Sequence, residues 1–131
     1  MSIICRTHNG LLRLYTKGAD SIIARRLTAR SAAEFAKMTE PALCTFAAEG
    51  LRTLCVAYAD LDEERYQTWA REMTAAALLV DAKKKAERLD KLQSDIESNL
   101  TLLGATAIED QLQVGVPETI ETLMQAGINI W

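Results

Sequence analysis

The sequence predicts a mixed α/β (α+β) fold, in which an antiparallel sheet carries flanking helices and is followed by a βαβ unit. Asn9-Gly10 lies between two strand-like runs, a pattern typical of a tight hairpin. Residues 62–98 favour a helical conformation and contain no Gly or Pro to end it. Residues 100–131 then read as a strand, a helix and the start of another strand. With 131 residues, 49% of them hydrophobic, the chain can bury one domain-sized core.

The first two strands are predicted over residues 1–6 and 11–16. The second run alternates with period two, so that Leu12, Leu14 and Thr16 share one face. Lys17-Gly18-Ala19 then leaves this strand. Asp20 stands at the position of an N-cap, which predicts a short helix over residues 21–27.

A longer helix is predicted from Ser31 to Gly50. Glu34 lies three residues after Ser31, so the two residues fit a capping box. Pro41 falls inside this stretch, and because proline cannot donate the helical hydrogen bond, we expect it to kink or divide the helix.

Residues 53–59 are apolar and rich in strand formers, which predicts a mostly buried strand. An acidic cluster follows, made of Asp60, Asp62, Glu63 and Glu64. Carboxylates gather where a helix begins because they interact favourably with its dipole, so we interpret these as capping and surface charges rather than catalytic acids. The helical region that they open is expected to divide near residues 80–84.

The last third of the chain begins with a buried strand over residues 100–108. Pro117 near the first helical position and Gly127 near the last predict a helix between them. Residues 128–131 look like the start of a further strand. An apolar, unfinished strand at the end of a chain suggests a piece trimmed from a larger protein, and we expect the unpaired strands to promote self-association.

Composition excludes several classes of function. The net charge of -3 provides no field for nucleic acid. The longest apolar runs, residues 75–80 and 100–108, are far below the roughly 20 residues of a membrane span. Three cysteines without a CxxC pair indicate a reducing cytosol, and we expect all three thiols to be buried: Cys5, Cys44 and Cys55.

Other candidate residues have ordinary interpretations. His8 lies in the hairpin turn with no second ligand nearby, so no metal role is assigned. Lys83, Lys84 and Lys85 are interpreted as a solvated helix face, with contact to a lipid headgroup as the minor alternative. Taken alone, Lys17 followed by a glycine is only a modest signal for ligand binding.

Four segments match a known family in order and spacing, namely residues 12–20, 49–58, 99–113 and 115–131. The most specific parts are residues 50–54, 104–110 and 116–120. On these residues the chain resembles the phospholipid-transporting (type IV) P-type ATPases, the flippases. The match covers about half of the chain, and the remaining stretches are similar to the family only in length and helical character.

The resemblance implies two partial domains. Residues 1–99 would be the C-terminal part of the nucleotide-binding domain, and residues 100–131 the hinge and the beginning of a haloacid-dehalogenase-like phosphorylation domain. Lys17, Gly18 and Ala19 would line the adenosine pocket, and Arg52 would approach the phosphates of ATP. Asp110 would lie in the hinge and help to position the nucleotide.

The resemblance also implies the activity of a parent protein. Such an integral membrane protein would phosphorylate itself on an aspartate from ATP, with Mg²⁺, and move phospholipid toward the cytosolic leaflet together with an accessory membrane subunit. This segment would be cytosolic. The sequence lacks the Asp-Lys-Thr-Gly-Thr motif that carries the phosphorylated aspartate, so the chain alone is expected to be inactive and to hold no metal.

Two alternatives stay open on the sequence. The first is a non-catalytic α/β interaction module, whose helical region 63–98, with Trp69 and Met73, binds a partner. The second is the nucleotide-binding domain of a cation-transporting P-type ATPase, which shares Lys17-Gly18-Ala19 but which the hinge sequence at residues 108–113 disfavours.

Overall fold

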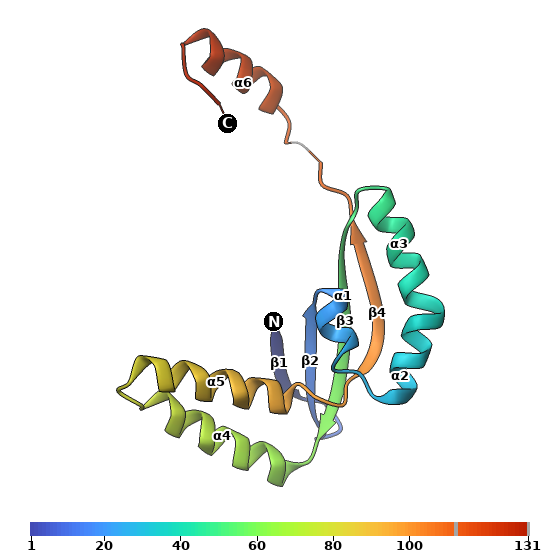
Figure 1. The fold of residues 1–131 in the computed structure, drawn as a ribbon, viewed down its shortest axis with the longest axis vertical. Coiled ribbons are helices and arrows are strands. Elements are labelled where there is room, and N and C mark those ends of the chain that lie inside the picture. Colours follow the sequence, from blue (N-terminus) through green and yellow to red (C-terminus); the bar gives the residue numbers. More distant parts are fainter. Residues whose placement is uncertain (112, 131) are drawn as a thin grey trace.

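The sheet has four antiparallel strands in the order β1-β2-β3-β4, as seen in the computed structural model, which describes residues 1–111 and 113–130 (Figure 1). Each strand pairs with the next along the chain. This arrangement confirms the predicted antiparallel α/β class. The strands are β1 (Ser2–Arg6), β2 (Leu12–Gly18), β3 (Arg52–Leu61) and β4 (Thr101–Ile108).

The helices lie between and after these strands. The α4–α5 pair folds back on itself as a hairpin, and α6 stands apart from the sheet beyond β4 (Figure 1). In the described residues no helix is both long and apolar enough to cross a bilayer. The helices are α1 (Asp20–Ala24), α2 (Ala29–Glu34), the π-helix η1 (Phe35–Thr39), α3 (Glu40–Ala48), α4 (Glu63–Ala77), α5 (Ala82–Ile96) and α6 (Val116–Gln125).

The predicted β1–β2 hairpin is confirmed, with a turn over residues 7–11. The backbone N–H of Thr7 donates to Leu11 O at 2.8 Å, and Gly10 takes a φ of 82° that favours glycine. The predicted alternation along β2 is also confirmed, because Leu12, Leu14 and Thr16 are all buried.

Two predicted helix caps are wrong. Ala19, not Asp20, is the N-cap of α1, and the Asp20 carboxylate accepts only from the adjacent Ser21 N at 2.6 Å. Thr28, not Ser31, caps α2 through its hydroxyl. The Ser31 side chain is instead buried, where its hydroxyl accepts from Leu102 N of β4 at 2.7 Å, so the need of a buried amide for a partner decides its role.

The helix interruptions were correctly predicted. The π-helix η1 lies directly before α3, which has Pro41 at its first or second position. Because proline cannot donate to the carbonyl four residues earlier, a widened turn accommodates it. The region after β3 divides at residues 78–81 into α4 and α5. Asp62 caps α4 by accepting from Arg65 N at 2.7 Å, whereas Asp60 lies in β3 and is not a capping residue.

The strand that was expected to open a separate βαβ unit belongs to the sheet instead. β4 pairs antiparallel with β3, from Arg52 opposite Ile108 to Tyr58 opposite Thr101. The predicted βαβ unit would also need a second strand, parallel to β4, and the described residues after α6 form none. Residues 128–130 form no strand, and Trp131 lies outside the described residues.

The predicted limits of α6 are confirmed. Pro117 lies in its first turn, where the missing N–H costs nothing. At the other end Gly127 has a φ of 77°, and its N–H donates to Met124 O at 3.0 Å while Ile128 N donates to Leu123 O at 3.0 Å. This pair of hydrogen bonds is a Schellman motif.

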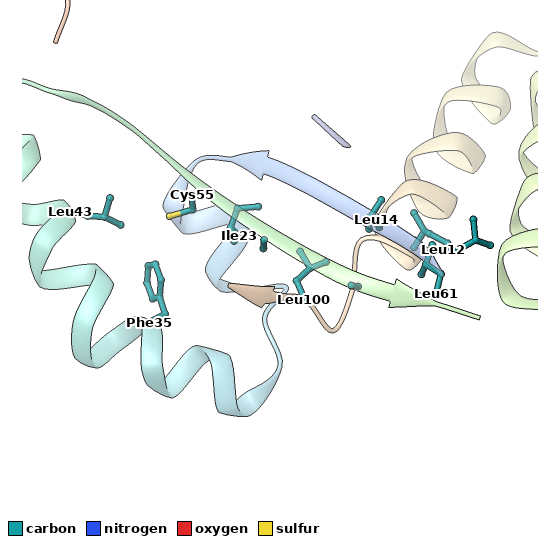
Figure 2. Packing of buried hydrophobic residues seen from close by; sticks show 11 residues of the cluster. Leu12, Leu14, Ile23, Phe35, Leu43, Cys55, Leu61 and Leu100 are labelled. Atoms are coloured by element: carbon teal, nitrogen blue, oxygen red, sulfur yellow. The ribbon is translucent and has the colours of Figure 1, made fainter. Parts of the chain in front are cut away.

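One hydrophobic core lies against a single face of the sheet (Figure 2). Alternate residues of β2 and β3 supply the sheet side of this core. Each of the helices α1, η1, α3 and α5 contributes one buried apolar residue to it. The members are Leu12, Leu14, Ile23, Phe35, Leu43, Cys55, Ala57, Ala59, Leu61, Ile96 and Leu100. Of the cysteines only Cys55 is buried; Cys5 is half-buried and Cys44 is exposed, which corrects the prediction for those two thiols.

The intervening residues of β2 and β3 point to the other side of the sheet, because successive side chains of a strand face opposite ways. None of them belongs to the buried core. We call this side the open face. From these two strands it carries Arg13, Tyr15, Lys17, Arg52, Leu54, Val56, Tyr58 and Asp60.

Candidate functional site

Lys17 lies on the open face at the end of β2. It is exposed and stands directly opposite Val56 of β3. Gly18 follows opposite Cys55, and Ala19 starts α1 by accepting from Ile22 N and Ile23 N at 3.1 and 3.0 Å. The sequence Lys17-Gly18-Ala19 therefore carries the chain from the open face to the helix-covered face within three residues.

A hollow of about 190 Å³ lies beside Lys17. Its lining is mostly apolar, and among the lining residues Lys17 alone has a side chain that is charged at neutral pH. Three neighbouring strands contribute. The lining residues are Met1, Ser2, Ile3, Tyr15, Thr16, Lys17 and Val56. The arrangement suits a flat, mostly apolar ligand group with a hydrogen-bond acceptor for the ammonium.

Arg52 begins β3 and is paired directly with the predicted hinge residue. Its guanidinium lies 2.7 Å from the Asp110 carboxylate, and the two side chains are 77% and 64% exposed. An ion pair this exposed contributes no more than about 1 kcal/mol, so a competing anion can replace it at small cost. The structure thus brings together two residues for which the sequence implied separate roles.

Lys17 and Arg52 lie on the same face of the sheet. Val56 stands opposite Lys17, and Arg52 precedes Val56 by four residues, an even number that keeps the face unchanged. At a rise of about 3.3 Å per residue, the two positions are about 13 Å apart along the strand. The hollow at Lys17 does not extend to Arg52.

A row of polar and aromatic side chains continues the open face beyond Lys17, and the sequence analysis missed it. Arg13 contacts Asp60 through two hydrogen bonds of 2.5 and 2.9 Å. Its guanidinium carbon lies 4.5 Å from the centre of the Tyr58 ring, and the Tyr58 ring lies 6.4 Å from that of Tyr15. The Arg13 hydrogen bonds lower the pKa of Asp60. Alternation along β2 puts Tyr15 and Lys17 on one face, but only the strand register reveals the residues opposite them.

The described residues contain no group of three or more His, Cys, Asp or Glu side chains that could hold a metal ion. His8 is exposed in the turn. Lys83 and Lys84 are exposed at the start of α5, and Lys85 is half-buried, in agreement with a helix face turned to solvent.

The helical region that was offered as a partner-binding surface folds on itself. The Trp69 indole N–H donates to Leu92 O at 3.0 Å, joining α4 to α5. Trp69 and Tyr66 also pack against the core of the sheet. Much of the apolar surface on which the interaction-module alternative depended is therefore used within the chain.

Comparison with known proteins identifies the family of the chain. The family model of the P-type ATPase cytoplasmic domain N matches residues 1–115. Over its full length of 131 residues the chain is 50% identical to phospholipid-transporting ATPase ID of Homo sapiens, 47% to phospholipid-transporting ATPase IK of Mus musculus and 48% to phospholipid-transporting ATPase DRS2 of Saccharomyces cerevisiae.

The whole chain is covered in each of these comparisons, but it spans only 11%, 10% and 9% of the three relatives. The matched domain and the relatives lead to one assignment: the chain belongs to the type IV, phospholipid-transporting P-type ATPases, and its residues 1–115 match their cytoplasmic domain N.

Proposed function

We propose that the chain is the ATP-binding segment of a phospholipid-transporting ATPase, with the nucleotide lying along the open face. The adenosine occupies the hollow at Lys17, and the phosphates extend toward Arg52. The observation that carries this proposal is the shared face of the two cations, about 13 Å apart by strand rise.

The hollow suits the adenosine half. Ile3 and Val56 offer apolar contacts to the base, and the Lys17 ammonium can donate to a ring nitrogen or a ribose hydroxyl. Gly18 and Ala19, which the resemblance also assigned to the adenosine pocket, follow Lys17 in the chain but do not line this hollow. Helix α1 is short, and its first turn carries the negative Asp20 carboxylate. The phosphates are therefore not expected at the N-terminal end of this helix.

Arg52 supplies the charge for the phosphates. A guanidinium can bind phosphate oxygens through two parallel hydrogen bonds, which makes it a better match than its present partner, the single carboxylate of Asp110. Binding of the phosphates therefore exchanges one ion pair for another.

The described residues offer no cation site, so Mg²⁺ enters only with ATP and with the segments of the parent protein that lie outside this chain. Affinity should consequently be similar for ATP, ADP and AMP. With the hollow and Arg52 alone, a millimolar Kd is expected, equivalent to only about 4 kcal/mol.

The domain division also changes in this proposal. β4 pairs with β3, so the nucleotide-binding part extends through Ile108 rather than residue 99. Residues 109–115 form the hinge, with Asp110 near its start. α6 then begins the phosphorylation domain.

The parent protein is proposed to be an integral membrane enzyme that couples ATP hydrolysis to phospholipid movement toward the cytosolic leaflet, with an accessory membrane subunit. The names of the relatives support the transport of phospholipid. This segment lies in the cytosol, and alone it has no turnover because the sequence has no Asp-Lys-Thr-Gly-Thr motif.

The test is an NMR titration with ATP, ADP and AMP, each with and without Mg²⁺. We expect amide shifts on β2 and β3 near Lys17 and Val56, with Kd values that agree within about threefold. Lys17→Ala should weaken all three nucleotides, and Arg52→Ala should weaken ATP and ADP more than AMP. Lys83→Ala, an exposed lysine of α5, is the control. Tight, Mg²⁺-dependent binding that is indifferent to Lys17→Ala would refute the proposal.

A further inference from the structure

We propose that the end of the α4–α5 hairpin is a docking site for an acidic amphipathic helix of a second protein. We call this surface the hairpin tip. Its members are Leu78, Leu79, Val80, Lys83, Lys84 and Arg88. None of them lines the hollow at Lys17, so the docking site does not depend on nucleotide binding.

The turn between α4 and α5 exposes three aliphatic side chains in succession. Leu78 is 78% exposed, Leu79 42% and Val80 101%. Turns are ordinarily built from Gly, Pro, Asn, Asp and Ser, so this turn gains nothing from three aliphatic residues. A contiguous apolar patch on a surface is typical of an interaction site, whereas single exposed apolar residues are not.

Three consecutive lysines follow in the first turn of α5, from Lys83 to Lys85, and this turn contains no acidic residue. Cations are unfavourable there because the N-terminal end of a helix is the positive end of its dipole. Asp81 caps the helix by accepting from Lys83 N and Lys84 N at 3.0 and 3.1 Å. Its carboxylate lies 3.9 Å from the Lys84 ammonium, at the limit of an ion pair. Carboxylates of a partner would relieve this accumulation of positive charge.

A hollow of about 360 Å³ lies between the two helices beside the tip, and its lining is mostly apolar. The lining residues are Glu72, Ala75, Ala76, Leu79, Lys84 and Arg88. Arg88 pairs with Glu72 at 2.8 Å, and these two side chains are 47% and 44% exposed, so another carboxylate can replace Glu72 at small cost. The hollow therefore suits an aliphatic side chain that has carboxylates one helical turn away on either side.

The distribution of charge favours a protein helix over an anionic membrane surface. Residues 78–91 contain five basic and three acidic side chains, a net charge of +2, and the acidic ones lie among the lysines: Asp81, Glu87 and Asp90. A bilayer presents a continuous negative surface, which attracts clusters of several cations and repels each of these carboxylates. A helix carries its carboxylates at discrete positions, so it can pair with the lysines and avoid the acidic residues.

The position of the hairpin makes the tip accessible to another protein. α4 follows the Leu61 end of β3, whereas Arg52, at the other end of this strand, stands opposite Ile108, where the proposed hinge begins. The tip is the part of the hairpin that lies farthest from the sheet (Figure 1). It therefore lies away from the hinge, which leads into the rest of the parent protein.

The experiment uses a peptide of about 15 residues, roughly four helical turns, with leucines along one face and glutamates beside them. A second peptide has glutamine at every glutamate position. Vesicles of phosphatidylcholine and phosphatidylserine represent the anionic membrane. Binding of each probe to the full chain of 131 residues is measured by NMR titration, and retained dispersion of the amide spectrum checks that each variant is folded.

The tip variants are Val80→Ser and the double variant Lys83→Gln/Lys84→Gln. The matched controls lie on η1: Met38→Ser changes an apolar residue that is 72% exposed, and Lys37→Gln changes an exposed lysine. We expect the glutamate peptide to shift amides of residues 76–88. Each tip variant should raise its Kd about tenfold, and each control should leave it within about twofold. Added salt should weaken the binding because it screens the charges.

A glutamate peptide that shifts no amide of the hairpin tip overturns the docking site, as does an equal loss of affinity in the tip variants and their controls. Equal Kd values for the glutamate and glutamine peptides would show that the surface does not select an acidic partner. Vesicles that shift the tip amides at a lower concentration than the peptide does would make the tip a membrane contact instead.

Discussion

Ser31 shows how one hydroxyl can join a helix to a sheet edge. Its side chain is buried within α2 and accepts from the Leu102 N–H of β4 at 2.7 Å. Ser31→Ala would leave that amide without its partner, in a place that water does not easily reach. We expect a loss of about 1–3 kcal/mol in the free energy of unfolding, measured by urea denaturation.

A matched control for this substitution is Ser94→Ala. Ser94 is exposed in the last turn of α5, so its replacement should change the free energy of unfolding by less than about 0.5 kcal/mol. Hydrogen exchange adds a local readout, since the Leu102 amide should exchange faster in Ser31→Ala. Equal stability of the two variants would show that the hydroxyl contributes nothing.

Asp60 gives the chain a pH-dependent contact. Hydrogen bonds from Arg13 lower the pKa of this carboxyl in the folded state. A lowered folded-state pKa means that the contact stabilises the fold above the pKa of the unfolded chain, about 4, and that this contribution is lost as the pH falls through the folded value. The effect is small because the pair is exposed to solvent.

Asp60→Asn should therefore lower the stability at pH 7, and this deficit should shrink toward pH 2 as the wild-type carboxyl becomes protonated. Urea denaturation at both pH values measures the difference, and added salt at pH 7 should reduce it. A deficit of the variant that is equal at both pH values would assign the effect to packing rather than to charge.

At the scale of the elements, local patterns predicted local structure well. The alternation of β2 and the Pro and Gly at the ends of α6 depend on neighbours within a few residues, and both predictions hold. At α2 the pattern selected Ser31 as the cap, and this was wrong because the cap is Thr28. The outcome depended on Leu102, about seventy residues away, whose amide needed the Ser31 hydroxyl.

Contacts between distant segments were beyond the sequence for the same reason. β4 was assigned to another unit because a strand followed by a helix fits a βαβ pattern equally well until its partner is known. The open face likewise needed the register, which alone puts Tyr58 beside Tyr15. For the proposed site, the resemblance suggested Lys17 and Arg52, but neither resemblance nor spacing indicated that Arg52 pairs with Asp110.

The whole molecule has two sheet edges, and they are not alike. On β4 the edge amide of Leu102 is taken by Ser31, and the α2–α3 segment runs alongside (Figure 1). β1 pairs only with β2, so its other edge presents unpaired backbone groups among the described residues, with Ile3 62% exposed. An edge of this kind can pair with a second chain.

We therefore expect the isolated chain to self-associate into a dimer through β1. The fraction of the protein that is dimeric should grow with protein concentration. Ile3→Lys places a charge on this exposed strand and should shift the molecule toward the monomer, because edge lysines oppose strand pairing. Leu103→Lys is the matched control, since Leu103 is 56% exposed on the strand at the other edge. Sedimentation velocity over a range of concentrations distinguishes the outcomes. A monomer at every concentration would refute self-association, and equal loss of the dimer in both variants would show that β1 is not the contact.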